Sequence, residues 1–204
     1  MGSLTICCSQ PSCIASTVTV LNPCLQDVGQ IQKMVFWRKG NSLTPVSTSL
    51  IEATWTTLLS ATGDTKAIPT PFLGGVVIPA SEPREFGGGN ETRYGAPIRK
   101  GGGSVAVTAN MYGEDQDVIA ALKALRCEPL EVILINEANQ FIYSDDSTFS
   151  GFPIVANSLF VSDKQIGGMD DADLNVLTFN LAPNWSDTLE ITDVSTFALD
   201  MVNA

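Results

Sequence analysis

The chain has 204 residues, of which 22 are acidic and 11 are basic, so its formal net charge is −11. It contains no histidine, which excludes Ser-His-Asp and Cys-His catalysis and removes the commonest metal ligand at neutral pH. Its apolar content of 44%, with no run close to ~20 apolar residues, indicates a globular chain and excludes a membrane-spanning helix.

Residues 1–26 form a leader that is rich in cysteine, serine, threonine and proline, and its segment 17–21 could add one strand. The leader lacks the basic and apolar segments of a secretory signal, so we expect none. Its four cysteines do not have the spacing of a two-knuckle zinc site, and we expect reduced thiols, with zinc or disulfides as alternatives. These cysteines are Cys7, Cys8, Cys13 and Cys24.

The middle of the chain alternates between strand patterns and one ambiguous segment. Strands are predicted at residues 31–37, 75–79 and 104–111, the last from alternation of apolar with small or polar residues. Residues 49–61 place apolar side chains at helical spacing, although their threonines favour a strand almost as well. The sequence leaves both readings of this segment open.

The clearest helix is GEDQDVIAALKALRCEP, residues 113–129, which has acids at its start, cations near its end and a closing proline. We expect its apolar stripe to be Val118, Ile119, Leu122 and Leu125, and Cys127 to be a core thiol. Strands at 131–135 and 140–143 flank the turn NEAN and predict a hairpin. Further strands are predicted at 154–161, 174–181 and 189–196.

Two triple-glycine runs, residues 87–89 and 101–103, bracket the segment NETRYGAPIRK. Glycine loses the most entropy on ordering, so these runs predict an arm that is mobile alone and becomes fixed only against something else. As a hairpin of about eight residues on each side at roughly 3.3 Å apiece, it could place its tip about 25 Å from the domain. That is far enough to reach a neighbouring subunit.

Charge is distributed unevenly along the sequence. Residues 1–126 hold ten of the eleven basic and nine of the 22 acidic residues, and residues 127–204 hold one basic and thirteen acidic residues. This asymmetry favours head-to-tail association and argues against a grip on nucleic acid by the chain itself. The alternative is that the acidic half is only a well-solvated surface.

The order of elements, with an early strand, a long loop, a strand, one amphipathic helix and a hairpin with more strands, resembles the tail-tube-like fold of phage tail and connector proteins. The stretches GEDQDVIAALKALRCEPLEVILIN and EPREFGGGNETRYG look like those of ring-type or tail structural proteins of crAss-like phages and related Bacteroidetes prophages. The resemblance covers roughly residues 27–200 and contains no diagnostic motif. It implies a subunit that closes into a ring through sheet edges, with a long loop that clasps the adjacent subunit or ring.

We therefore expect a mainly β (α+β) fold, a tail-tube-like β-sandwich or barrel with one packed helix and a long glycine-bounded loop. The expected division is a leader or arm at residues 1–26 and a single β-rich domain at residues 27–204, with an inserted loop at residues 84–103. The expected subunit-interface residues are Arg84, Arg93, Tyr94, Arg99, Lys100 and Trp185.

The predicted function is that of a non-enzymatic structural virion subunit in a phage tail or neck, which self-assembles into a ring around the DNA channel. Its expected partners are copies of itself and adjacent tail, portal or neck proteins, with DNA only as passing cargo and no membrane. The main alternative is a ligand-binding β-sandwich module of a bacterial surface. A hydrolase is weaker, because no two acids stand out as a buried pair with separated pKa values.

We expect no cofactor and no metal. The acidic segment GGMDDADLN contains four oxygen-bearing side chains, Asp170, Asp171, Asp173 and Asn175, that invite a calcium interpretation. It departs from the EF-hand pattern, because Val176 stands where glycine is required and Ala182 where the bidentate glutamate is required. A solvated acidic loop before a strand is the alternative that we expect.

Overall fold

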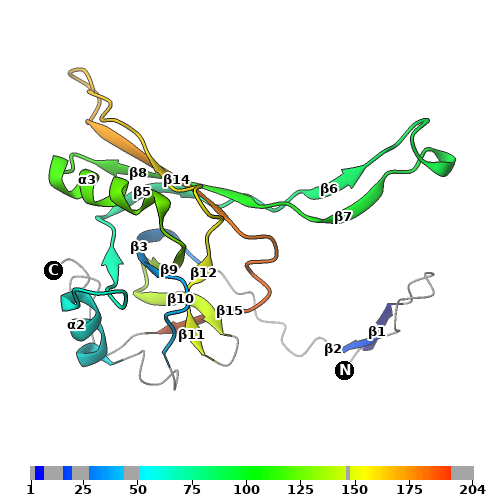
Figure 1. Ribbon diagram of the computed structural model, residues 1–204, viewed down its shortest axis with the longest axis horizontal. Coiled ribbons are helices and arrows are strands. Elements are labelled where there is room, and N and C mark those ends of the chain that lie inside the picture. The colour runs from blue at the N-terminus through cyan, green and yellow to red at the C-terminus, as the bar shows by residue number, and fades with distance from the viewer. Residues whose placement is uncertain (1–2, 7–15, 20–27, 44–50, 146–147, 194–204) are drawn as a thin grey trace.

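The structure is a computed structural model that describes residues 3–6, 16–19, 28–43, 51–145 and 148–193. Two antiparallel sheets form the body of the protein, and a two-stranded ribbon extends from one of them (Figure 1). Within the leader, β1 (Ser3–Ile6) pairs with β2 (Ser16–Thr19). The predicted strand at 17–21 overlaps β2. Cys7, Cys8, Cys13 and Cys24 lie outside the described residues.

The main sheet has seven strands in the order β11-β10-β9-β3-β4, with β12 also paired to β9 and β15 to β10. Its central strands β3 and β9 are buried along nearly their whole length, because both faces of this sheet are covered. The strands of this sheet are β3 (Ile31–Arg38), β4 (Ile68–Pro69), β9 (Leu130–Asn136), β10 (Gln140–Asp145), β11 (Phe149–Ser150), β12 (Phe152–Pro153) and β15 (Leu189–Asp193).

The second sheet has four strands in the order β13-β14-β8-β5. Its two long strands, β8 (Val105–Tyr112) and β14 (Leu174–Leu181), pair along their full length and bury every second residue, because only one face packs on the main sheet. The shorter strands are β5 (Leu73–Val77) and β13 (Phe160–Val161). The predicted mainly β sandwich with a packed helix is thus confirmed, and it is not a closed barrel.

The packed helix is α3 (Gln116–Ala124), which continues into the 3-10 turn η2 (Leu125–Cys127). Asp115 caps its N-terminus by accepting a hydrogen bond from the Asp117 amide at 3.0 Å. Ile119 and Leu122 are buried as predicted, whereas Val118 is exposed and does not belong to the stripe. Cys127 is also exposed, so the prediction of a core thiol is wrong, because the residue that η2 buries is Leu125 and not Cys127.

The ambiguous segment is a helix, α2 (Glu52–Ser60), on the face of the main sheet that the second sheet does not cover (Figure 1). Trp55 is fully buried and stacks on Trp37 and on Phe141, with ring centroids 6.4 and 4.9 Å apart. The threonines of α2 are accommodated in the helix, where Thr56 and Thr57 donate their hydroxyls to the carbonyls four residues earlier. Tertiary burial of one tryptophan decides a segment whose local pattern is balanced.

The predicted strand 154–161 is wrong. The chain leaves the main sheet at β12, makes a turn in which Asn157 has a φ of 59°, and enters the second sheet at β13. Ser158 N donates to the carbonyl of Val155 across this turn at 3.1 Å. The apolar residues of segment 154–161 therefore do not form one strand, and the segment connects the two sheets.

Candidate assembly surface

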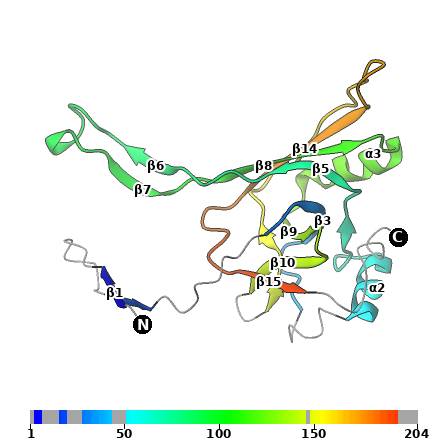
Figure 2. The same cartoon turned by 180° about the vertical axis from the view of Figure 1, so that it is seen from behind.

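The arm, residues 82–103, continues the hairpin of β5 and β8 beyond the edge of the body (Figures 1 and 2). Its strands β6 (Pro83–Phe86) and β7 (Ile98–Gly102) pair antiparallel, and its tip holds the 3-10 turn η1 (Arg93–Gly95). At its base the amide of Gly103 donates to the carbonyl of Glu82 at 2.7 Å. Both views show the arm standing away from the two packed sheets, as the glycine runs predict.

The glycine runs have distinct structural reasons at the two ends of the arm. At the base, a Cβ on Gly103 would lie 2.9 Å from the carbonyl oxygen of Glu82, closer than real side chains approach. At the tip, Gly88 has a φ of 118°, a backbone conformation that other residues rarely adopt. Glycine therefore allows the two strands to meet at the base and the chain to turn at the tip.

Hydrogen bonds around one threonine organise the tip. The hydroxyl of Thr92 accepts from the amide of Gly88 at 3.2 Å and donates to the carbonyl of Ala96 at 2.6 Å. The amide of Gly89 donates to the carbonyl of Gly95 at 3.3 Å, which ties the two sides together. The tip is thus a hydrogen-bonded turn that presents Tyr94, whose side chain is 88% exposed.

The two faces of the ribbon differ in chemistry. Phe86 and Ile98 are cross-strand partners, each about half exposed, and the ammonium of Lys100 lies 4.5 Å from the centroid of the Phe86 ring. The neighbouring pair, Glu85 and Arg99, forms an exposed ion pair at 3.4 Å. The apolar face of the arm, formed by Phe86 and Ile98 with Lys100 beside them, is therefore open to solvent on a strand pair that has no core of its own.

The structure brings five of the six predicted interface residues together on the arm. Arg84 is exposed in β6, and Arg99 and Lys100 lie in β7. Arg93 is the first residue of η1, and Tyr94 follows it at the tip.

Trp185 lies apart from the other five, in the loop between β14 and β15. It is partly buried and meets Phe152 edge-on with ring centroids 5.0 Å apart. In the described chain it therefore packs on the body, and its role at an interface stays a prediction.

Several exposed apolar residues were not predicted as surface features. Phe86 and Ile98 on the arm, and Ile166 and Met169 on the loop before β14, are each about half exposed or more. Their apolar type carries no signal of exposure in the sequence, since the same residue types fill the core. For Phe86, the adjacent glycine run at residues 87–89 is the sequence signal that indicates exposure.

That second loop, residues 163–173, is named here the acidic loop, and it projects from the body in both views (Figures 1 and 2). It contains four aspartates and one lysine. The amide of Gly167 donates to the carboxylate of Asp173 at 3.0 Å, whereas Asn175 is buried and donates its amide to the carbonyl of Ser162. The four side chains of the calcium interpretation therefore do not converge, and no group of three potential ligands occurs among the described residues.

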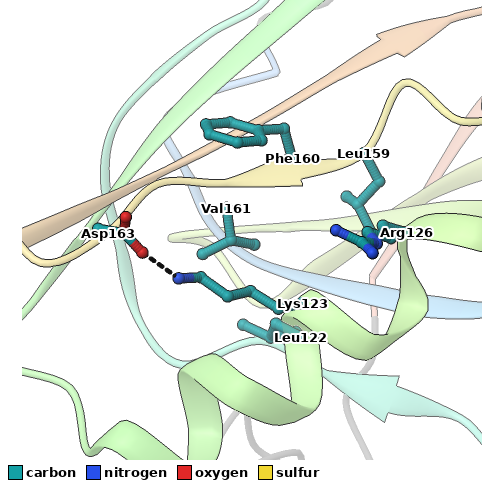
Figure 3. A pocket seen from close by; sticks show the side chains of 7 residues that line it. All are labelled: Leu122, Lys123, Arg126, Leu159, Phe160, Val161 and Asp163. Carbon is teal, nitrogen blue, oxygen red and sulfur yellow. Dashed lines mark hydrogen bonds and ion pairs between the residues drawn. The ribbon is translucent and has the colours of Figure 1, made fainter.

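A pocket of about 240 Å³ lies between α3 and β13, next to the start of the acidic loop (Figure 3). Lys123 crosses it to pair with Asp163 at 2.6 Å, and the hydrogen bond from this ammonium holds the pKa of Asp163 below its usual range. The floor is apolar, with Leu122 and Val161 below the exposed ring of Phe160. A second cavity of about 290 Å³ lies at the foot of the arm, between Val76, Trp185 and Leu189.

None of these cavities gathers a set of titratable groups that could carry acid–base chemistry. Glu114 has a raised pKa because burial disfavours its charge, with Lys164 opposing that effect. Glu131 also has a raised pKa because it is buried, and the amide of Gly40 donates a hydrogen bond to it at 3.4 Å. Glu131 is buried and Glu114 only partly so, and the two carboxyl groups belong to different parts of the fold, so they do not form a pair. In the described part of the chain, no helix is both long and apolar enough to span a membrane.

Comparison with known proteins gives only distant structural likenesses. No family model and no curated protein matches the chain. One similar solved chain comes from the tail of an empty GTA particle with C6 symmetry, at 15% identity and a TM-score of 0.34 over 64% of this chain and 88% of that chain. TM-scores below 0.5 do not establish a shared fold.

Two further similar chains come from the anti-feeding prophage. One belongs to its six-fold symmetrised baseplate, at 12% identity and a TM-score of 0.32 over 84% of this chain and 99% of that chain. The other belongs to the cap that terminates its tube, at 9% identity and a TM-score of 0.32 over 86% and 98%. The function of the present chain therefore has to be derived from its own surface.

Proposed function

We propose that the chain is a non-enzymatic structural subunit of a phage virion, located in the tail or neck, which assembles with copies of itself into a ring through its arm. The observation that carries this proposal is the arm itself, a ribbon that exposes Phe86, Tyr94 and Ile98 while standing clear of the body. An isolated two-stranded hairpin is at best marginally stable in water. A partner that covers the apolar face would supply the burial that the arm lacks.

The charges favour a copy of the same chain as that partner. The arm holds four basic and three acidic residues, which leaves seven basic and nineteen acidic residues in the rest of the chain. A weakly positive arm is attracted to a strongly negative body, whereas two weakly positive arms do not attract each other. Such a contact joins two different patches and is therefore heterologous, the kind of interface that closes into rings.

The same charge argues that DNA is passing cargo. A body with a large excess of carboxylates repels phosphate, so a channel lined by it would not retain the duplex. Adjacent tail, portal or neck proteins would be the further partners, and the virion the location. The sequence resemblance supports crAss-like phages and related Bacteroidetes prophages as the setting. The division into a leader and one β-rich domain with an inserted loop belongs to the same proposal.

The ligand-binding alternative has less support from the structure. The cavities at α3 and at the foot of the arm measure about 240 and 290 Å³, at the lower end of the ~300 to 1,000 Å³ that is typical of ligand pockets. In the first cavity Lys123 and Asp163 are already paired with each other, and the second is lined mainly by apolar residues.

Replacing residues 83–102 by a two-residue Asn-Gly turn tests the proposal. We expect the full chain to form a defined oligomer by native mass spectrometry and a ring by electron microscopy, and the shortened chain to stay monomeric. Because the deletion removes no core residue, the shortened chain should keep a β-rich circular dichroism spectrum and unfold cooperatively in urea. A shortened chain that keeps the oligomer mass, or a full chain that is monomeric at every concentration, would contradict the proposal.

A further inference from the structure

The acidic loop and the arm lie at opposite ends of the second sheet. Along the full pairing of β8 with β14, Val105 lies opposite Leu181 and Tyr112 lies opposite Leu174. The arm joins β8 just before Val105, and the acidic loop joins β14 just before Leu174. The two projections therefore point away from the sheet in opposite directions, as both views show (Figures 1 and 2).

The acidic loop exposes an unusual apolar pair. Met169 is fully exposed and Ile166 is 80% exposed, although neither packs on the body. Two large apolar side chains this exposed on one projecting loop make the loop a candidate interaction surface. Asp170 and Asp171 follow directly in the sequence and are also exposed.

Other polar groups of the acidic loop form hydrogen bonds within the chain. Gln165 and Leu174 exchange backbone hydrogen bonds at 2.8 and 3.0 Å, and these bonds close the loop at its base. Asp173 accepts from Gly167, and Lys164 donates to the carbonyl of Glu114 at 2.9 Å. Asp170 and Asp171 have no such partner among the described residues, so their charges are available to a docking molecule.

We infer that the exposed pair Ile166 and Met169, with Asp170 and Asp171 beside it, is the surface that receives the arm of a second copy. This inference rests on the proposed function and names the acceptor site within it. The two surfaces match in kind, because each combines two exposed apolar side chains with charge, basic at Lys100 and Arg84 on the arm and acidic on the loop.

Geometry selects a second copy over the same chain. The arm cannot reach the acidic loop of its own chain, because the length of the second sheet separates them. Copies that dock arm to loop follow one another in a single direction along the strands. Each copy then uses both surfaces once, which is the condition for heterologous assembly.

Charge reversal on each side tests the pairing in the full-length chain. The loop variant is D170K/D171K and the arm variant is R84E/K100E; the control is E52K/E137K, which reverses two exposed acids elsewhere on the body. We expect each of the first two to weaken self-association by about tenfold or more, as measured by sedimentation at 150 mM salt, because each places like charges together. The control should change it by less than about twofold. An equimolar mixture of the loop and arm variants should associate again, because both contacts between the two variants join opposite charges, the basic arm with the acidic loop and the acidic arm with the basic loop.

A photo-crosslinking amino acid at Ile98 gives the second readout. We expect the crosslinked dimer to map to residues 163–173 of the other copy by peptide mass spectrometry. Suppose that the arm deletion abolishes assembly, but D170K/D171K still associates normally and the crosslink maps outside residues 163–173. The arm then docks elsewhere, so the inference is wrong and the proposed function stands. If the arm deletion leaves assembly intact, the proposed function fails, and the inference fails with it.

Discussion

The main sheet and the arm show two ways in which strands of one chain are used. The main sheet is covered on one face by the second sheet and α3 and on the other by α2, so its central strands are almost fully buried. The arm is covered on neither face, and its apolar residues Phe86 and Ile98 remain exposed. Stability therefore resides in the body, and the arm carries surface whose burial awaits a partner. Changes in the two regions should consequently affect different measurements.

The largest effect is expected in the aromatic cluster beneath α2. Trp55→Ala removes the ring that stacks on Trp37 and Phe141 and leaves a cavity in a fully buried site. We expect the free energy of unfolding to fall by about 3–5 kcal/mol. Urea unfolding followed by circular dichroism measures this loss. A loss below about 1 kcal/mol would mean that α2 contributes little to the stability of the body.

A pH-dependent effect is expected at Glu131, which lies in β9 within the main sheet. Burial raises the pKa of this carboxyl group in the folded chain, so the folded state holds the proton to a higher pH than the unfolded state does. Its contribution to stability is then fully present below the unfolded pKa and is lost as pH rises through the folded pKa.

Glu131→Gln should remove this dependence. The stability of the parent chain relative to the variant is expected to be greater at pH 4 than at pH 7, as measured by urea unfolding at both values. Glu137→Gln, at an exposed position in the turn after β9, is the control for loss of one carboxylate. The reverse order of the two values would mean that charge, and not burial, dominates at this site.

The smallest effect on stability is expected on the arm. Phe86→Ser combined with Ile98→Ser removes two exposed apolar side chains and should change the free energy of unfolding of the unassembled chain by less than about 0.5 kcal/mol. The same variant should weaken self-association in sedimentation experiments, because it removes the apolar face. Large destabilisation without any change in association would make the arm part of the folded body and erase the contrast between the two regions.

Much of the fold follows from local patterns in the sequence. Alternation predicts β14 with its observed bounds, and the acids, apolar residues and proline predict α3. The two glycine runs predict a projecting arm from the conformational freedom of glycine alone, and the positive φ of Gly88 and Gly101 agrees with that freedom. These features depend on backbone geometry and on neighbours close in sequence.

Other features depend on which elements meet in space. Residues 154–161 read as one strand, yet the chain changes sheets at Asn157. The apolar residues Val118, Ile166 and Met169 are exposed, although they are of the same types that fill the core. Burial is set by long-range packing, which a local pattern does not contain.

The sequence by itself therefore determined that there is an arm and that the acidic residues are concentrated in the C-terminal part of the chain. Only the tertiary structure decided that the arm and the acidic loop lie at opposite ends of one sheet, because that placement comes from the pairing of β8 with β14, strands more than sixty residues apart.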